Sequence, residues 1–584
     1  MTCEEMIYSN DYADYTINFL QGFEAAEEVY RTGCVNSIEN NIAILHMPRK
    51  TDYLVNLEDT PYSFIPKLFG LMDSSNMEAS GVKAVQNPSK LGLDGKNVVV
   101  GVIDTGIDYQ NPLFLDENGN SRIGVLWDQT IQGTKKEGTL PEALYGSVFS
   151  REKINEAIQS QNPYEVVASK DENGHGTFMA GVAAGRANRE NDFIGVAPGA
   201  ELAVVKLKET KPYLREYFGV PQDVAAYQET DIIYAIEYLI RYANQKKLPI
   251  SIFIGVGTSN GGHFGQTFLE RYLSTILENA GIMVSVPAGN EGNERLHYAG
   301  EIKEQEAYQE VEFNVADGQQ MLTMEFWGNK PTTFALGLIS PQGDRIEQIP
   351  PRFGKEEILR LPLAKTTIYV AYQLTETFSG NELIFIRLTN PTPGLWRFLI
   401  YAEEARQRTF NIWMPLRQFL RKDTYFLKGE PNNTITAPGN TPLVMTLTAY
   451  NHLNNSIYAD ASRGYNSLQQ VKPDLAAPGV DITGPGLRNN FVRRTGTSVA
   501  AAHSAGMMAL FLQWNIENYE VGIFYAKQIQ SLFLKNADRD LEVEYPNPVW
   551  GYGRMNIEYV FNAFSVVEYI GREDRLLSIL NRNQ

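Results

Sequence analysis

The run VVVGVI at residues 98–103 is short, continuously apolar and rich in β-branched side chains, as expected of a strand that is buried on both faces of a parallel sheet. Similar runs recur further along the chain, at residues 201–205, 250–254 and 282–286. Helical stretches lie between them, including residues 230–245 and 268–280. Strands that alternate with helices predict a doubly wound α/β domain with a parallel sheet.

The pattern changes on both sides of this domain. Residues 1–75 follow the order strand, helix, strand, strand, helix, strand, which is the ferredoxin-like order. Residues 302–435 hold many short strands with closely spaced turn signals and no long helix, which predicts an all-β insert, a sandwich or jelly roll. The α/β domain is therefore expected in two pieces, residues 76–301 and residues 436–584.

Charge and cysteine content exclude several classes of function. The 584 residues carry 51 Lys and Arg against 69 Asp and Glu, a formal charge of −18, so nucleic acid is not expected as a partner. The two cysteines, Cys3 and Cys34, both lie near the N-terminus, and all later segments must fold without disulfides or thiolate metal ligands. This suits a reducing compartment, although secreted bacterial enzymes are also often free of cysteine.

Targeting and membrane segments are not evident. The first residues, MTCEEMIYSNDYADY, lack the basic and apolar regions of a Sec signal peptide. The longest apolar stretch, residues 499–512, has about 14 residues and contains His503, whereas a membrane span needs roughly 20. We predict a protein without a membrane span.

Four polar side chains occupy strand ends and helix starts. Asp104 ends the run at 98–103, His175 opens a helix rich in small residues, Asn290 follows the strand at 282–286, and Ser498 opens an apolar helix. Each alone is most simply a cap or turn residue. Their occurrence together, in contexts that doubly wound sheets use for their sites, favours a common site.

These residue types suit nucleophilic catalysis. A carboxylate can orient an imidazole, the imidazole can take the proton of a serine hydroxyl, and amide N–H groups can stabilise the resulting tetrahedral oxyanion.

The order of these residues and their flanks resemble the subtilisin family of serine peptidases. The matching segments are VIDTGID (102–108), NGHGT (173–177), AGN (288–290), KPDLAAPG (472–479), GTSVAA (496–501) and GYGRMN (551–556). The resemblance covers about residues 76–300 and 435–565. It implies that Asp104 orients the imidazole, His175 acts as base and then acid, Ser498 is the nucleophile and Asn290 is the oxyanion donor.

The resemblance also implies a substrate site. Gly255, Val256 and Gly257 match the strand edge that pairs with substrate backbone, and Ala288 and Gly289 match one wall of the primary specificity pocket.

Three positions depart from the family pattern, and none of them is a catalytic group. Phe178 replaces a common histidine, Ala502 replaces a usual proline, and Gly255 replaces a usual serine. These departures bear on specificity more than on activity.

Residues 1–75 resemble the family's prodomain, and the layout with a long β insert resembles the clostridial Csp proteases of spore germination. The resemblance implies a serine endopeptidase that acts on proteins or peptides and cuts off its own prodomain. The short polar stretch DSSN at residues 73–76 is the natural cleavable connector, so we place the cut between Met72 and Ala79. The resemblance further suggests that the freed prodomain stays bound as an inhibitor. Activation of a cortex-lytic enzyme and a cytoplasmic or spore-associated location are the corresponding expectations.

The sequence leaves calcium binding and one alternative function to be considered. Many subtilisins bind calcium, but no acidic loop here is specific enough to name ligands, so we expect no cofactor and assign no metal residue. The alternative function is a catalytically silent subtilase scaffold that acts as a sensor or binding protein, with the insert as its partner surface.

Overall fold

The computed structural model describes residues 12–18, 34–39, 42–48, 77, 79–210, 212–351, 356–376, 378–402, 408–518 and 524–564. The chain divides into two units, Met1–Met72 and Asp73–Gln584.

The first unit contains a three-stranded antiparallel sheet in the order β1-β3-β2. Its strands are β1 (Tyr12–Asn18), β2 (Cys34–Glu39) and β3 (Ile42–Pro48). Val35 and Leu45 are buried. The predicted helices of this unit (23–31 and 51–58), its predicted last strand (62–71) and most of the predicted cleavage segment (72–79) lie outside the described residues.

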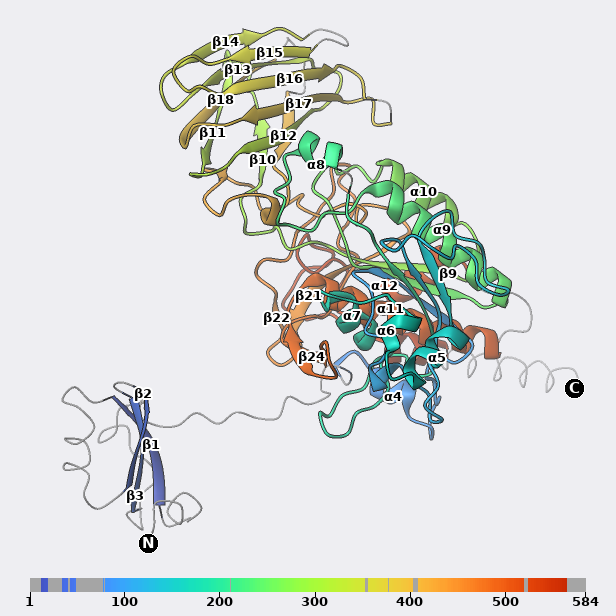
Figure 1. Ribbon diagram of the computed structural model, residues 1–584. Coiled ribbons are helices and arrows are strands. Elements are labelled where there is room, and N and C mark those ends of the chain that lie inside the picture. The colour runs from blue at the N-terminus through green and yellow to red at the C-terminus, as the bar shows by residue number, and fades with distance from the viewer. Residues whose placement is uncertain are drawn as a thin grey trace, which may run out of the picture. The chain divides into compact units, whose positions relative to one another are not determined.

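A nine-stranded, mostly parallel sheet forms the centre of the second unit (Figure 1). Along the sheet the order is β22-β21-β9-β8-β4-β7-β5-β6, with β23 paired to β21. Its strands are β4 (Val99–Asp104), β5 (Ile123–Asp128), β6 (Ser147–Ser150), β7 (Glu201–Lys206), β8 (Ile250–Ile254), β9 (Ile282–Pro287), β21 (Met445–Asn451), β22 (Ser456–Ile457) and β23 (Leu475–Pro478). The predicted parallel sheet is confirmed, and the runs at 98–103, 201–205, 250–254 and 282–286 are four of its adjacent strands.

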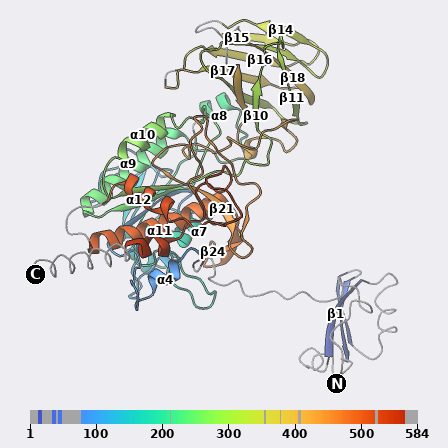
Figure 2. The same cartoon turned by 180° about the vertical axis from the view of Figure 1, so that it is seen from behind.

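Helices cover both faces of this sheet (Figure 1; seen from behind in Figure 2). On one face, α11 (Thr497–Asn518) packs on β8, β9, β21 and α7 (His175–Ala184), and Ser251 Oγ of β8 donates to the carbonyl oxygen of Ala505. On the other face, a Cβ on Gly101 of β4 would stand 2.9 Å from Leu239 of α9 (Glu229–Lys246). The sheet is therefore enclosed, which explains its continuously apolar strands.

The smaller helices surround this frame. They are α4 (Val82–Gln86), α5 (Arg151–Gln159), α6 (Pro163–Val166), α8 (Pro212–Phe218), α10 (Phe268–Ile276) and α12 (Ala526–Lys535). Helix α10 ends four residues before the predicted end at 280. No helix in the described ranges combines the length and apolarity that crossing a bilayer requires.

Two antiparallel sheets occupy the chain between β9 and β21, and they share one apolar core. The first sheet, in spatial order, contains β10 (His297–Glu301), β19 (Thr409–Trp413), β12 (Met321–Gly328), β17 (Glu382–Thr389), β16 (Thr367–Gln373) and β15 (Glu356–Arg360). The second contains β14 (Arg345–Ile349), β13 (Phe334–Ile339), β18 (Gly394–Ala402), β11 (Gln309–Val315) and β20 (Tyr425–Phe426). We call this part the β insert.

The β insert begins earlier in the chain than predicted. Strand β10 precedes residue 302, yet it pairs with β19. Its sequence, HYAGE, is too short and too rich in small and polar residues to be recognised as a strand without its partner.

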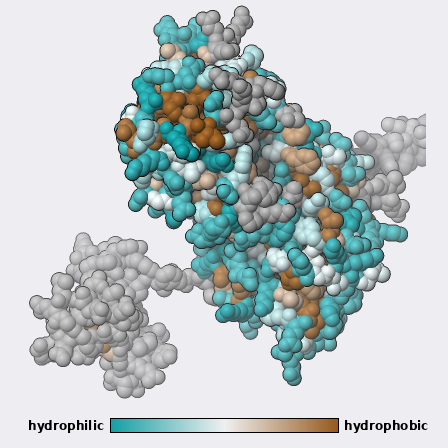
Figure 3. All heavy atoms as spheres, turned by 45° about the horizontal axis from the view of Figure 1, so that its top comes forward, coloured by the Kyte–Doolittle hydropathy of each residue, from teal (hydrophilic) through white to brown (hydrophobic). Residues whose placement is uncertain are grey.

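The β insert contacts the α/β part through a small apolar cluster of Phe264, Trp327 and Trp413. Beside it, the Glu325 carboxylate accepts hydrogen bonds from Asn260 Nδ2 (2.7 Å) and the backbone N–H of Gly261 (2.8 Å). On the outer surface, Figure 3 shows apolar side chains gathered in a patch on the β insert.

Candidate active site

Asp104 and His175 lie in direct contact at the carboxyl end of the parallel sheet. Asp104 is the last residue of β4 and is 1% exposed, and His175 is the first residue of α7. His175 Nδ1 lies 2.8 Å from Asp104 Oδ1 and 2.9 Å from Oδ2. The carboxylate therefore holds the ring by Nδ1, which leaves Nε2 as the atom for proton transfer.

This contact determines the direction in which the pKa of His175 is shifted. Burial opposes protonation of the ring, but the charge of Asp104 and its hydrogen bond outweigh burial and raise the pKa of His175 above its usual value. The charge of Arg494 acts in the opposite direction, and that of Asp171 adds to the increase.

The packing around the Asp104 carboxylate requires glycine. A Cβ on Gly255 would stand 1.7 Å from Asp104 Oδ2, and a Cβ on Gly176 would stand 2.2 Å from the carbonyl oxygen of Gly106. The departure at Gly255 therefore has a physical reason, because the carboxylate occupies the space of a side chain there.

Asp171 organises the loop that leads to His175. Its carboxylate accepts five hydrogen bonds, from Thr105 Oγ1 (2.9 Å), Asn173 N (3.1 Å), Gly174 N (2.8 Å), Thr177 N (2.9 Å) and Thr177 Oγ1 (2.7 Å). Gly174 and Thr177 flank His175 at the start of α7, where backbone N–H groups have no partner within the helix. Sequence reasoning missed this role. An acidic residue four positions before the histidine was the available signal.

Asn290 is held against the start of α11. Its Oδ1 accepts from both the backbone N–H and the hydroxyl of Thr497, each at 3.1 Å. Because a backbone N–H can only donate, the amide oxygen must point at Thr497, and Nδ2 points elsewhere. A Cβ on Gly496 would stand 3.7 Å from Asn290 Nδ2 and 4.0 Å from the backbone nitrogen of Ser498. Two N–H donors thus border one small space beside Gly496.

Ser498 lies in the first turn of α11 and is partly exposed, whereas most of that helix is buried. Its hydroxyl forms no hydrogen bond with any described residue, so the structure does not join His175 to Ser498 directly. Catalytic hydrogen bonds are often long before substrate binds. His175 contacts the last residue of β4, and Thr497 contacts Asn290, which follows the end of β9, so both helix starts lie at the carboxyl end of the sheet.

Residues 255–257 continue from β8 as a partly exposed segment. The N–H of Gly255 donates to the carbonyl oxygen of Ile103 (3.0 Å), and no other backbone hydrogen bond joins residues 255–257 to the described chain. Their remaining backbone groups can therefore pair with an extended peptide.

Ala288 and Gly289 are held in place by hydrogen bonds to their carbonyl oxygens. The carbonyl oxygen of Ala288 accepts from the N–H of Thr436 (2.9 Å), and that of Gly289 accepts from the N–H of Ser462 (2.9 Å). Gly289 has a φ of 104°, and a Cβ there would stand 2.7 Å from Ser462 Oγ, so only glycine fits.

Within the ranges that the structure describes, no group of three or more His, Cys, Asp or Glu side chains could hold a metal ion.

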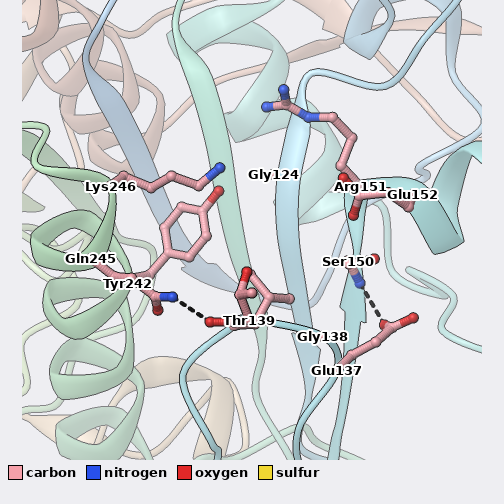
Figure 4. A pocket seen from close by; sticks show the side chains of 11 residues that line it. Gly124, Glu137, Gly138, Thr139, Ser150, Arg151, Glu152, Tyr242, Gln245 and Lys246 are labelled. Atoms are coloured by element: carbon pink, nitrogen blue, oxygen red, sulfur yellow. Dashed lines mark hydrogen bonds between the residues drawn. The ribbon is translucent and has the colours of Figure 1, made fainter.

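A separate cavity of about 290 Å³ lies near the amino end of β5 (Figure 4). Asp104 lies at the opposite, carboxyl end of the parallel strands. Figure 4 shows Tyr242 and Lys246 together on one side and Arg151 across from them. Arg151 Nη2 and the Tyr242 hydroxyl both donate hydrogen bonds to the Glu201 carboxylate.

Comparison with known proteins identifies the family of this chain. The model of the Subtilase family matches residues 95–311 and 421–553, which is more than half of the chain. The chain belongs to the subtilase family. Its matched residues include all four side chains of the candidate site.

Individual relatives are proteases by name. The subtilisin-like protease SBT1.9 of Arabidopsis thaliana is 24% identical over 82% of this chain and 64% of that protein. C5a peptidase of Streptococcus pyogenes serotype M18 is 24% identical over 81% of this chain and 39% of that protein. The chain thus spans less than two thirds of the length of these two relatives.

A solved structure shares nearly the whole architecture. The Clostridium perfringens CspB protease is 28% identical with a TM-score of 0.74, and the match covers 83% of this chain and 96% of that chain. The predicted resemblance to subtilases and to Csp proteases is therefore confirmed.

Proposed function

We propose that this protein is a serine endopeptidase in which Asp104, His175 and Ser498 form the catalytic triad and Asn290 stabilises the oxyanion. The observation that carries the proposal is the contact in which His175 Nδ1, at the start of a helix, donates to the Asp104 carboxylate, 2.8 Å from Oδ1 and 2.9 Å from Oδ2. The family membership and the names of the relatives support it.

The proposed mechanism assigns one role to each of these groups. Ser498 Oγ attacks the peptide carbonyl carbon, and its proton passes to His175 Nε2. Asn290 Nδ2 and the Ser498 N–H donate to the oxyanion. His175 then gives the proton to the leaving amine, and water hydrolyses the acyl-enzyme by the same route. Asp104 stabilises the imidazolium in both steps.

The same proposal includes the substrate site and maturation. Residues 255–257 would pair with the substrate backbone, and Ala288 and Gly289 would line the primary pocket. Residues 1–75 would be a ferredoxin-like prodomain, removed between Met72 and Ala79 and retained as an inhibitor. The order β1-β3-β2 of the described strands supports the ferredoxin-like arrangement.

The biological role is a narrower proposal. The likeness in layout and structure to the CspB protease supports a role in spore germination, with activation of a cortex-lytic enzyme as the reaction. The β insert, proposed as a sandwich or jelly roll, would then pack on the catalytic domain and restrict its motion. General intracellular or surface proteolysis is the alternative.

A fluorophosphonate probe tests the catalytic proposal. The full chain should be labelled at Ser498, whereas Ser498→Ala should stay unlabelled and lose about 10⁶-fold in kcat. Intact-mass measurement should find wild type as two fragments of roughly 75 and 510 residues and Ser498→Ala as one chain. An unlabelled wild-type protein that cleaves no peptide would instead support the silent scaffold.

A further inference from the structure

Arg494 lies close to the start of α7, the helix that begins with the proposed catalytic histidine. It is the last residue of β25 (Phe491–Arg494), which forms a hairpin with β24 (Ile482–Pro485), and β24 packs on α7. Arg494 Nη2 lies 3.6 Å from the position that a Cβ on Gly174 would occupy, and Gly174 directly precedes His175. The guanidinium also faces the ring of Phe178, with 5.7 Å between Cζ and the ring centre.

The Arg494 guanidinium has no acidic partner in the described part of the chain. It forms no hydrogen bond or ion pair there, and its Nε is buried without a partner. The neighbouring Arg493 points to the opposite side of the hairpin, because side chains alternate along a strand, and lies 3.7 Å from Asp481. The hairpin thus carries one paired arginine and one unpaired arginine.

The carboxylates of the site cannot supply the missing partner. Asp104 is occupied by His175 and by the N–H of Thr105, and Asp171 accepts five hydrogen bonds from the loop before His175. The Arg494 side chain is partly exposed, so its guanidinium is accessible to an anion from outside the chain. An anion supplied by the substrate satisfies it, since guanidinium and carboxylate form strong charge-assisted hydrogen bonds.

We infer that Arg494 determines specificity by pairing with an acidic side chain of the protein substrate, at one of the two positions that follow the scissile bond. This inference rests on the proposed function. We assign this position because His175 delivers its proton to the leaving amine, and Arg494 lies near the start of the helix that carries His175 and its charge acts on that ring. The predicted cleavage segment between Met72 and Ala79 contains two acidic residues, Asp73 and Glu78.

Matched fluorogenic peptides test the inference with the full-length protein. The peptides differ only in Asp, Asn or Lys at the first or second position after the cleaved bond. Wild type should prefer Asp over Lys by about ten- to a hundredfold in kcat/KM. Arg494→Gln should abolish that preference, and Arg494→Glu should reverse it. Arg493→Gln, on the other side of the hairpin, should retain the wild-type preference.

The pH profile supplies a readout that loss of folding would not produce. The positive charge of Arg494 lowers the pKa of His175, whereas the negative charges of Asp104 and Asp171 raise it. Removing the guanidinium in Arg494→Gln should therefore move the acidic limb of kcat/KM to higher pH, measured with a neutral peptide. An unmoved limb would contradict the placement of Arg494 beside His175.

Labelling with the fluorophosphonate probe distinguishes failure of the inference about Arg494 from failure of the proposed function. If wild type and the Arg494 variants are labelled and cleave the peptides without charge preference, the inference is wrong and the proposed function stands. If wild type is neither labelled nor cleaves any peptide, the proposed function is wrong and the inference is wrong with it. Retention of the Asp preference in Arg494→Glu would also overturn the inference.

Discussion

The α/β part and the β insert bury their strands in different ways. In the α/β part, β4, β5 and β9 are buried at every position. In the β insert, buried and partly exposed positions alternate along β11 and β16. A strand covered by helices on both faces has room for few polar side chains along its length, so most polar groups lie where strands end and helices begin. Asp104, Asn290, His175 and Ser498 all lie at such positions.

The largest expected effect is on the stability of the β insert. Phe313 is fully buried in its core, 4.6 Å from the ring of Phe398, and Phe313→Ala should cost about 3–5 kcal/mol in free energy of unfolding. The kcat of the folded protein should stay unchanged, because the proposed catalytic groups lie in the α/β part. Denaturant unfolding and probe-titrated kcat check this, with the exposed Ile358→Ala as control. If kcat falls while the variant is still fully folded, the β insert and the α/β part are coupled in catalysis.

The second effect is on catalysis alone. Asn290→Leu should lower kcat about 10²- to 10³-fold with little change in KM, because the amide acts on the oxyanion and not on the bound substrate. Asn293→Leu, at an exposed position of the same loop, should behave as wild type. Steady-state kinetics decide the matter, and a loss confined to KM would remove Asn290 from the proposed oxyanion site.

The third prediction concerns the pH dependence of the site. His175 must be neutral to act as a base, and the Asp104 charge and hydrogen bond raise its pKa despite burial. The acidic limb of kcat/KM should therefore lie above the ordinary histidine pKa of about 6.5. A profile recorded from pH 5 to 9 tests this, and a limb at or below the ordinary value would mean that Asp104 does not hold the ring in solution.

The smallest effect is expected where the two parts meet, at Glu291. Burial, assisted by Glu294 and opposed by the N–H of Arg417, raises the pKa of Glu291 to about 7. Its unfolded pKa is about 4.3, so its contribution to stability is complete below that pH and is lost as pH rises to about 7. Glu291→Gln should match the Tm of wild type at pH 4 and exceed it above pH 7.

Thermal unfolding across this range measures the effect, with the exposed Glu304→Gln as control. If the Tm difference between Glu291→Gln and wild type is the same at every pH, burial does not raise the pKa of Glu291.

The sequence was informative where one local pattern had one structural solution. The β-branched runs could only be enclosed parallel strands, and the flanks of Asp104, His175, Asn290 and Ser498 identified the family. Short strands such as β10 and β20 were missed, because five or two residues carry too little pattern without the partner strand.

The sequence by itself determined which side chains could take part in the chemistry of this protein and on which kinds of element they lie. Only the tertiary structure decided what each of them contacts. Asp171 became the centre of a five-bond network, and Arg494 came to lie beside His175 from a hairpin more than 300 residues away. The physical reason is that periodicity and capping act over a few residues, whereas hydrogen bonds and charge interactions depend on distance in space.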